Sequence, residues 1–308
     1  MTIIGVDIGG TKCALSVPEG TNKVREVARF NTTDVSSTLD RIYAEIRKLG
    51  PGSDVVFGVS CGGPLDAKKG LILSPPNLPG WDRIAICAEL VKRFGGRAFL
   101  MNDANACALA EWQFGAGRGC QSMIFLTMGT GMGAGLILDG RLYEGITGNA
   151  GEVGHLRLSA EGPVGFNKAG SFEGWCSGGG IAQIAKLRVP AFGGQSLLQK
   201  LSPEQMTARA VGEAAAAGDA LALSIWGEVG EKLGEALALF IDLINPERVV
   251  IGSIYQRCEK FIAPAMKAVI SREALPDSAR DCEVRPAELG DEIGSYAAVA
   301  IARYHAAK

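Results

Sequence analysis

The chain has 308 residues, of which 47% are hydrophobic and 21% are charged, and its formal net charge is −2. This balance is typical of a folded globular protein and excludes a mainly disordered chain. Lys and Arg form no dense cluster, so we expect no nucleic-acid partner. The sequence contains neither a secretory signal nor an apolar run long enough to cross a membrane, so no membrane association is expected.

Short apolar runs alternate with helical patterns along the chain. Runs rich in Val, Ile and Leu predict strands at 2–8, 13–17, 54–60, 97–102, 122–128, 133–138 and 247–252. Helices are predicted at 38–50, 83–95, 104–115 and 220–245, and Pro246 is a stop signal for the last one. This mixture predicts an α/β fold. The eight cysteines include no Cys-x-x-Cys pair, which favours reduced thiols and a cytoplasmic location.

Two distant segments share one pattern. Residues 5–17 and 126–138 each combine an apolar strand, a glycine-rich turn with a threonine, and a second apolar strand. The repetition indicates two related domains that face one ligand, although two unrelated glycine-rich hairpins remain the alternative. We expect a smaller first domain at 1–116, closed by a C-terminal helix at 292–308, and a larger second domain at 117–291.

The first glycine-rich turn carries groups that suit phosphate. Backbone N–H groups of Gly9 and Gly10 and the Thr11 hydroxyl are donors for phosphate oxygens, and Lys12 adds a positive charge. Asp7, just before the turn, is suited to a hydrated Mg²⁺. The turn does not match the P-loop pattern, and no helix follows it as a dinucleotide-binding turn requires.

Further polar residues follow a predicted strand or lie among glycines. Asp103 stands between the strand at 97–102 and the next helix, where it is either a helix N-cap or a base that accepts a proton from an alcohol. Asn102 beside it suits hydroxyl groups. Glu152 and His155, three residues apart among glycines, suit a ligand with many hydroxyls. A structural hydrogen bond for His155 and a solvated carboxylate for Glu173 remain the alternatives.

Taken together, the chain resembles the ROK family of sugar kinases, repressors and open reading frames, within the sugar kinase, actin and Hsp70 superfamily. The resemblance rests on the order of "VDIGGTK", "GVSCGGPLD", "NLPGW", "NDANACALAEWQFGAG", "TMGTGMGAGLILDG", "GNAGEVGH", "FEGWCSG", "INPERVVIG" and "LGDEIGSYAA". It implies two ribonuclease-H-like, actin-like ATPase domains with a ligand cleft between them. It also implies ATP-dependent phosphorylation of a sugar hydroxyl, usually O6 of a hexose or N-acetylated amino sugar, with Mg²⁺, in a homodimer.

The resemblance also assigns roles to single residues. Asp103 matches the family's general base, and Gly252 matches the nucleotide side, although Ser253 replaces a second glycine there. The expected sugar-binding residues are Gly63, Asn77, Asn102, Glu152, His155 and Glu173. The expected phosphate-binding residues are Gly9, Gly10, Thr11, Lys12, Thr130 and Gly131, with Asp7 also on the nucleotide side.

One family feature is missing. Most members have three cysteines that, with the upstream histidine, bind a structural zinc, and Val164, Phe166 and Ser171 stand at those three positions here. Because a structural zinc needs four firm ligands, we expect none. Val164 and Phe166 are expected to anchor the loop by apolar burial instead.

Two other functions stay open at this point. The lost zinc ligands and Ser253 are compatible with a sugar-binding regulator without useful turnover. The family's repressors carry an N-terminal DNA-binding module, whereas the first strand here begins at residue 3, which favours a kinase. An acyl-phosphate kinase of the same superfamily fits poorly, because a small carboxylate does not need the hydroxyl-binding groups.

Overall fold

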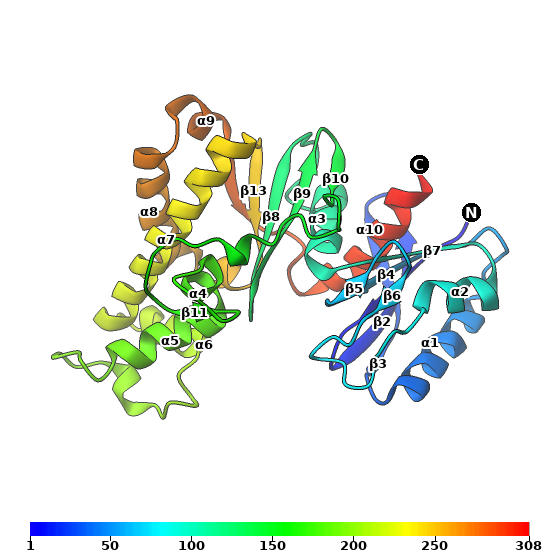
Figure 1. Cartoon of the computed structure of the whole chain (residues 1–308), viewed down its shortest axis with the longest axis horizontal. Coiled ribbons are helices and arrows are strands. Elements are labelled where there is room, and N and C mark those ends of the chain that lie inside the picture. Colours follow the sequence, from blue (N-terminus) through cyan, green and yellow to red (C-terminus); the bar gives the residue numbers. More distant parts are fainter. Residues whose placement is uncertain (308) are drawn as a thin grey trace. The chain divides into compact units, whose positions relative to one another are not determined.

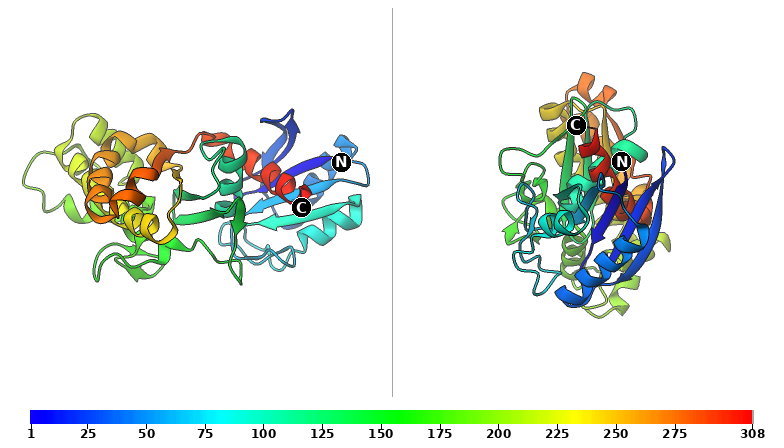
Figure 2. Two further views of the ribbon diagram at one scale, coloured as in Figure 1. Left: turned by 90° about the horizontal axis from the view of Figure 1, so that it is seen from above. Right: turned by 90° about the vertical axis from the view of Figure 1, so that its right-hand side faces the viewer.

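The computed structural model describes residues 1–307 and divides into two compact units. The first unit contains Met1–Cys120, Gly135–Ala150 and Glu288–Lys308, and the second contains Gln121–Ala134 and Gly151–Ala287. Figure 1 and Figure 2 show the elements of each unit. The domain boundaries expected from the sequence stay a prediction; by its contacts, the segment Gly135–Ala150 belongs to the first unit.

A five-stranded sheet forms the centre of the first unit. Its order is β3 (Lys23–Asn31), β2 (Lys12–Glu19), β1 (Ile3–Ile8), β4 (Val56–Cys61) and β7 (Arg97–Met101). Strands β1, β4 and β7 are parallel, while β2 runs antiparallel to both β1 and β3. The carboxyl ends of the three parallel strands therefore meet at one edge, where ligands bind in open α/β sheets.

Helices pack on the first unit's sheet because alternate residues of each strand point to opposite faces. On one face, Ile4, Val6 and Ile8 of β1 join a buried cluster with side chains of α1 (Val35–Leu49) and α2 (Ile86–Phe94). On the other face, a side chain at Gly5 or Gly58 would collide with Ala298 of α10 (Ile293–Ala306). These glycines let α10 lie against β1 and β4, next to α3 (Asp103–Phe114).

The second sheet has the order β10 (Arg141–Tyr143), β9 (Met132–Leu138), β8 (Met123–Met128), β13 (Arg248–Ile251) and β14 (Glu283–Pro286). Strand β13 is parallel to both β8 and β14. The chain passes from the second unit to the first within β9. Two short hairpins complete the strands: β5 (Leu65–Asp66) with β6 (Leu71–Ile72), and β11 (Val164–Gly165) with β12 (Lys168–Ala169).

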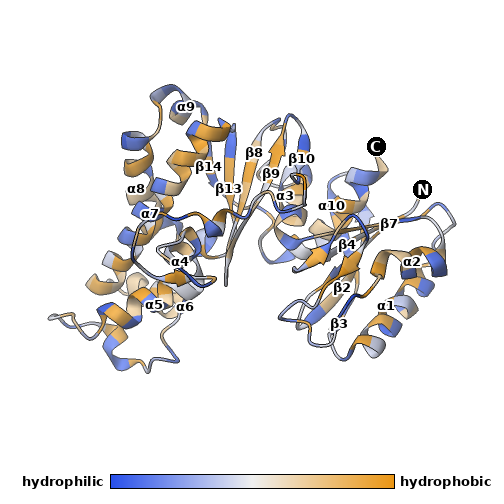
Figure 3. Cartoon of the chain, in the orientation of Figure 1, coloured by the Kyte–Doolittle hydropathy of each residue, from blue (hydrophilic) through white to orange (hydrophobic). Residues whose placement is uncertain are grey.

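The second unit is rich in helices. They are α4 (Phe172–Cys176), α5 (Gly178–Arg188), α6 (Ala208–Ala216), α7 (Ala220–Ile244), α8 (Ile254–Glu273) and α9 (Pro276–Asp281). The long helix α7, mostly hydrophobic in Figure 3, packs along α8. An added side chain at Gly230 or Gly234 of α7 would collide with backbone carbonyls of Ile262 and Met266, so these glycines permit close contact of the two helices.

The α/β class and all predicted strands and helices are confirmed, with boundaries shifted by a few residues. Several elements were not predicted, among them β3, α5, α6 and α8. Strand β3 is a charged edge strand, and α8 contains Pro264, a residue that usually marks a helix end. None of the eight cysteines, all of which lie within residues 1–307, forms a disulfide. Among residues 1–307, no helix combines the length and the apolar character that a bilayer crossing requires.

Candidate functional site

The first group of predicted site residues lies at the carboxyl edge of the first unit's sheet. The register aligns Asp7 of β1 with Ser60 of β4, and Ser60 with Met101 of β7. Asn102 and Asp103 follow Met101 directly, and Gly63 lies two residues after the end of β4. The sequence thus brings residues from three separate strands to one edge of the sheet.

The glycine turn between β1 and β2 is closed by a hydrogen bond from Gly9 N–H to the Lys12 carbonyl, 3.0 Å long. The Thr32 hydroxyl donates to the Gly9 carbonyl over 2.6 Å and fixes the start of the turn. A side chain at Gly10 would lie 2.4 Å from the backbone oxygen of Asn77. Gly10 is therefore required for the segment with Asn77 to approach, while Thr11 and Lys12 remain exposed.

Asp7 has a strongly perturbed acidity. Partial burial raises its pKa to about 6, with an opposing effect from Arg29 and further increases from the negative charges of Asp103 and Glu26. The negative charge of Asp103 thus disfavours the ionised form of Asp7. Near neutral pH, Asp7 is therefore mainly ionised, although its surroundings disfavour the charged form.

At the start of α3, Asn102 caps the helix and Asp103 is its first residue. The N-cap is Asn102, whose Oδ1 accepts a hydrogen bond from Asn105 N–H over 2.8 Å. The alternative that Asp103 is the cap is wrong: Asp103 is the first helical residue, and its Oδ1 accepts from Ala104 N–H over 2.9 Å. Asp103 is accessible to solvent, yet the protein around it displaces water and raises its pKa. As a carboxylate, Asp103 can accept a proton from a hydroxyl group.

The second group of predicted residues lies in the second unit, around the turn between β8 and β9. Gly129 N–H donates to the Gly131 carbonyl over 3.1 Å, and the Gly129 carbonyl accepts from Gly178 N–H over 2.8 Å. Thr130 at the tip is exposed. The first turn of α5 therefore holds this glycine turn in place.

Glu173 contacts the same turn directly. Its Oε2 accepts a hydrogen bond of 3.1 Å from Met132 N–H, and a side chain at Gly131 would lie 2.9 Å from that oxygen. A side chain at Gly154 would be 2.3 Å from the Met132 carbonyl and 3.3 Å from Glu173 Cβ. A residue predicted to bind sugar thus contacts a turn predicted to bind phosphate, and a glycine beside His155 permits it.

Glu152 precedes a single 3₁₀ turn, Val153–His155, and His155 is its last residue; both side chains are exposed. The His155 ring meets the edge of the Phe166 ring, with 4.9 Å between centroids. The His155 carbonyl accepts a 2.6 Å hydrogen bond from Lys168 Nζ. The backbone of His155 is therefore fixed, while its imidazole packs against an exposed aromatic ring.

Gly252 lies at the carboxyl end of β13 and is buried behind Phe125. Its N–H donates to the Leu126 carbonyl over 2.9 Å. The next residue, Ser253, has φ +58° and ψ −110°, a backbone region that favours glycine. Ser253 thus has a backbone conformation that suits the glycine expected at this position from the family pattern.

The expected burial of Val164 and Phe166 is wrong. Val164 is 46% exposed and Phe166 is 73% exposed. Phe166 and Asn167 form the two-residue turn of the β11–β12 hairpin with φ +43° and +61°, so Phe166 stands at the hairpin tip. Ser171 is fully buried and caps α4 by accepting from Gly174 N–H over 3.1 Å. Residues 1–307 contain no group of three or more His, Cys, Asp or Glu side chains that could hold a metal ion.

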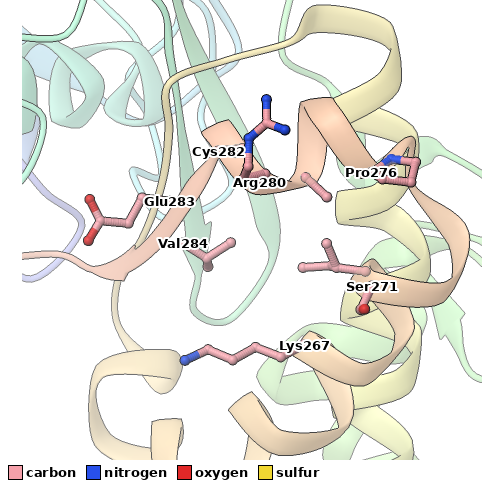
Figure 4. A pocket seen from close by; sticks show the side chains of 9 residues that line it. Lys267, Ser271, Pro276, Arg280, Cys282, Glu283 and Val284 are labelled. Carbon is pink, nitrogen blue, oxygen red and sulfur yellow. The ribbon is translucent and has the colours of Figure 1, made fainter.

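Some contacts of the site were not predicted. Gly294 at the start of α10 faces Asp7, and Thr32 fixes the first turn. Gly294 lies in the quoted motif "LGDEIGSYAA", but its role depends on a helix that returns from the far end of the chain. A cavity of about 550 Å³ between α8, α9 and β14 contains none of the predicted residues; Lys267, Arg280 and Glu283 are among its lining (Figure 4).

Comparison with known proteins supports the resemblance. Residues 3–305 match the family model described as "ROK family". The chain is 31% identical to a glucokinase of Thermotoga maritima, over 98% of this chain and 97% of the relative. It is 29% identical to the transcriptional regulator NagC of Escherichia coli, over 92% of this chain and 68% of the relative.

Solved structures show the same fold. A ROK family glucokinase from Streptomyces griseus, in complex with glucose and AMPPNP, superposes with a TM-score of 0.76 at 28% identity. The superposition covers 98% of this chain and 99% of the glucokinase. With a family model that matches nearly every residue and relatives of the same length and fold, this chain belongs to the ROK family.

Proposed function

We propose that the chain is a sugar kinase that transfers the γ-phosphoryl group of ATP to a hydroxyl of a hexose or N-acetylated amino sugar, with O6 as the acceptor. The proposal is supported by the family, by the glucokinase from Thermotoga maritima, and by the glucokinase structure that holds glucose and AMPPNP. The observation that carries it is the position of Asp103, a solvent-accessible carboxylate at the carboxyl edge of a parallel sheet that also carries Asp7.

Asp103 is proposed as the general base. Its raised pKa increases its affinity for a proton, while its exposure leaves it open to a substrate hydroxyl. The acceptor oxygen forms a bond to the γ-phosphorus, the bond from that phosphorus to the bridging oxygen of ADP breaks, and the hydroxyl proton passes to Asp103. ADP and the sugar phosphate are the products.

The sugar is proposed to bind Asn102, Glu152, His155 and Glu173, with Gly63 and Asn77 lining the same site. Asn102 Oδ1 is used in the helix cap, so its amide nitrogen is the group left for a sugar oxygen. Glu152 and His155 are exposed on one short turn and suit neighbouring hydroxyls. Several hydrogen bonds to one ring fix its orientation, which raises the rate by positioning the acceptor hydroxyl.

The two glycine turns are proposed to bind the nucleotide phosphates. Gly9, Gly10 and Thr11 offer backbone and hydroxyl donors, Lys12 adds a charge, and Thr130 and Gly131 do the same from the second turn. Asp7 fits a hydrated Mg²⁺, because the nearby charge of Asp103 leaves an excess of negative charge that a cation offsets. When bound, Mg²⁺ supplies charge stabilisation for the phosphates. Gly252 is proposed to line the nucleotide side.

The decisive experiment compares Asp103→Asn with Asp40→Asn, an exposed aspartate on α1. Sugar-dependent ADP release is measured with glucose, mannose, fructose, allose and N-acetylated amino sugars. Loss of a general base is expected to lower the rate by about 10²- to 10⁴-fold in Asp103→Asn, with Asp40→Asn unchanged. A rate for Asp103→Asn within about tenfold of the wild type would contradict the assignment.

A sugar-binding regulator is the second candidate, favoured by the 29% identity to NagC. It predicts sugar binding in calorimetry with no sugar-dependent ADP from any member of the panel. The kinase predicts ADP release with at least one sugar. A homodimer and a cytoplasmic location are part of the proposal, and sedimentation of the purified chain tests the first of these.

A further inference from the structure

Gln183, on α5, forms a paired contact with the backbone of Val164 in the β11–β12 hairpin. Its Nε2 donates to the Val164 carbonyl over 2.8 Å, and its Oε1 accepts from Val164 N–H over 3.0 Å. A side-chain amide that bonds both backbone groups of one residue acts like a neighbouring strand. The contact therefore fixes both the position and the orientation of β11.

The hairpin lies directly against Glu173. Gly165 follows Val164, and a side chain added there would lie 2.7 Å from Glu173 Cβ and 2.5 Å from Gly174 N. The Gly165 carbonyl also accepts a 3.4 Å hydrogen bond from the Ser171 hydroxyl. Glycine at 165 thus lets the hairpin backbone form a wall behind the first residues of α4.

Glu173 is held on its other side as well. Its Oε2 accepts from Met132 N–H, and Gly131 and Gly154 both come within close range of its side chain. The carboxylate therefore lies between the hairpin and the glycine turn. Movement of the hairpin away from α4 would give Glu173 room to change its rotamer.

The Ser171 hydroxyl ties β11 to the start of α4 through Gly165, whereas Gln183 ties it to α5. Val164 is nearly half exposed and Phe166 is largely exposed, so apolar burial contributes little to holding the hairpin. The bonds from Arg157 to the Ala169 carbonyl and from Lys168 to the His155 carbonyl fix β12 to the preceding loop rather than to α5. The amide pair of Gln183 is therefore the main polar contact by which α5 restrains β11.

We propose that Gln183 is a positioning residue for the sugar site: it holds β11 against Glu173 so that the carboxylate is preset for a sugar hydroxyl. This inference rests on the proposed function, because it takes Glu173 as a sugar ligand. Gln183 itself contacts no sugar. A preset carboxylate loses less rotamer freedom on binding, so the contact raises sugar affinity.

The test uses Gln183→Ala, which removes both hydrogen bonds, and Gln183→Glu, which keeps the shape but cannot donate to the Val164 carbonyl. Lys186→Ala, one turn further along the exposed side of α5, is the control. Calorimetry measures the affinity for glucose and, separately, for AMPPNP. Hydrogen–deuterium exchange follows the segment 163–170, and ADP release with glucose is recorded in parallel.

We expect glucose affinity to fall by about 3- to 10-fold in both Gln183 variants, with AMPPNP affinity within about twofold of the wild type. Exchange at 163–170 should rise in both and stay unchanged in Lys186→Ala. A purely structural defect would instead weaken both ligands together and lower the thermal midpoint.

The outcomes separate the two proposals. Faster exchange with unchanged glucose affinity would overturn the role of Gln183 while the kinase proposal stands. A wild type that binds glucose but releases no ADP would contradict the kinase proposal, and the affinities of the variants would still decide the role of Gln183. Absence of any glucose binding by the wild type would overturn the inference in the form stated.

Discussion

Gly294, in the first turn of α10, faces the carboxylate of Asp7: a side chain at position 294 would lie 2.6 Å from Asp7 Oδ2. The two residues are separated by nearly the whole length of the chain, yet both belong to the first unit. Gly294 is not required by its own backbone conformation, which is helical. Glycine inside a helix lowers the stability of that helix, and this contact explains why it is needed here: it leaves space for the Asp7 carboxylate, a candidate metal ligand.

Gly294→Ala is expected to displace Asp7 and reduce the rate of sugar phosphorylation by about tenfold or more, because catalytic groups tolerate little misplacement. Gly227→Ala is the matched control: Gly227 also lies inside a helix, but nothing lies within 4 Å of an added side chain. The control should keep full activity and gain about 0.5–1 kcal/mol in unfolding free energy. Both variants are compared by ADP release and urea unfolding; equal rates would contradict the role of Gly294.

Asp7 makes the stability of the chain depend on pH. Its pKa is about 6 in the folded state against 3.8 as the ordinary value, so the folded state holds a proton more tightly. The contribution of Asp7 to the unfolding free energy therefore falls as pH rises from about 4 to about 6. Above pH 6 the contribution stays at this lower value. Asp7→Asn, which carries no charge, should be more stable than the wild type at pH 8 by about 1–2 kcal/mol, after allowance for partial solvent exposure.

Urea unfolding at pH 4 and pH 8 tests this dependence, with Asp40→Asn as the control. The difference between Asp7→Asn and the wild type should shrink at pH 4, where the wild-type carboxyl is also neutral. An Asp7→Asn chain that is no more stable than the wild type at pH 8 would show that the surroundings do not penalise the charge.

The coupling between Asp7 and Asp103 gives a further prediction. Because the negative charge of Asp103 raises the pKa of Asp7, Asp103→Asn should lower the Asp7 pKa below about 6. Burial is the larger cause, so the pKa should stay above its ordinary value of 3.8. The carboxyl carbon resonance of Asp7, followed by NMR between pH 3 and 8, measures the change. An unmoved titration curve would mean that the two carboxylates do not interact.

Local patterns in the sequence were sufficient for much of the fold. The glycine turns, the strand that ends before Asn102 and the long helix before Pro246 all follow from short-range signals. The contact of Glu173 with Met132 could not be predicted, because it depends on how residues 41 positions apart fold together. The exposed tip at Phe166 was missed because an apolar residue in a loop was taken as an anchor, whereas the two-residue turn places it outside.

Ser253→Gly is expected to stabilise the chain. Ser253 has φ +58°, where a β-carbon is strained and glycine is not. Relief of the strain should outweigh the entropy lost with glycine and raise the unfolding free energy by up to about 1 kcal/mol. Ser278→Gly, in the short helix α9 with no positive φ, is the control and should be destabilised. Thermal unfolding midpoints compare the two, and a lower midpoint for Ser253→Gly would exclude strain at this position.

Glu111 connects two segments of the first unit, and its substitution should lower the unfolding free energy more than the other substitutions above. It is fully buried on α3, and its carboxylate accepts hydrogen bonds from the N–H groups of Ala116, Glu288 and Leu289 at 2.7–3.1 Å. In Glu111→Gln an amide nitrogen would replace one acceptor and face these donors. The unfolding free energy should fall by about 2–4 kcal/mol, since hydrogen bonds to a buried charge are strong and their loss leaves donors unpaired.

Glu213→Gln is the control for that substitution, because Glu213 is exposed and pairs with Arg209 on the same helix. An exposed pair of this kind contributes little, so the control should change the unfolding free energy by less than about 0.5 kcal/mol. Urea midpoints at pH 7.5 compare both variants with the wild type. Similar midpoints for the two variants would mean that backbone contacts alone hold Ala116 and Glu288 in place, and that the buried carboxylate is replaceable by a neutral acceptor.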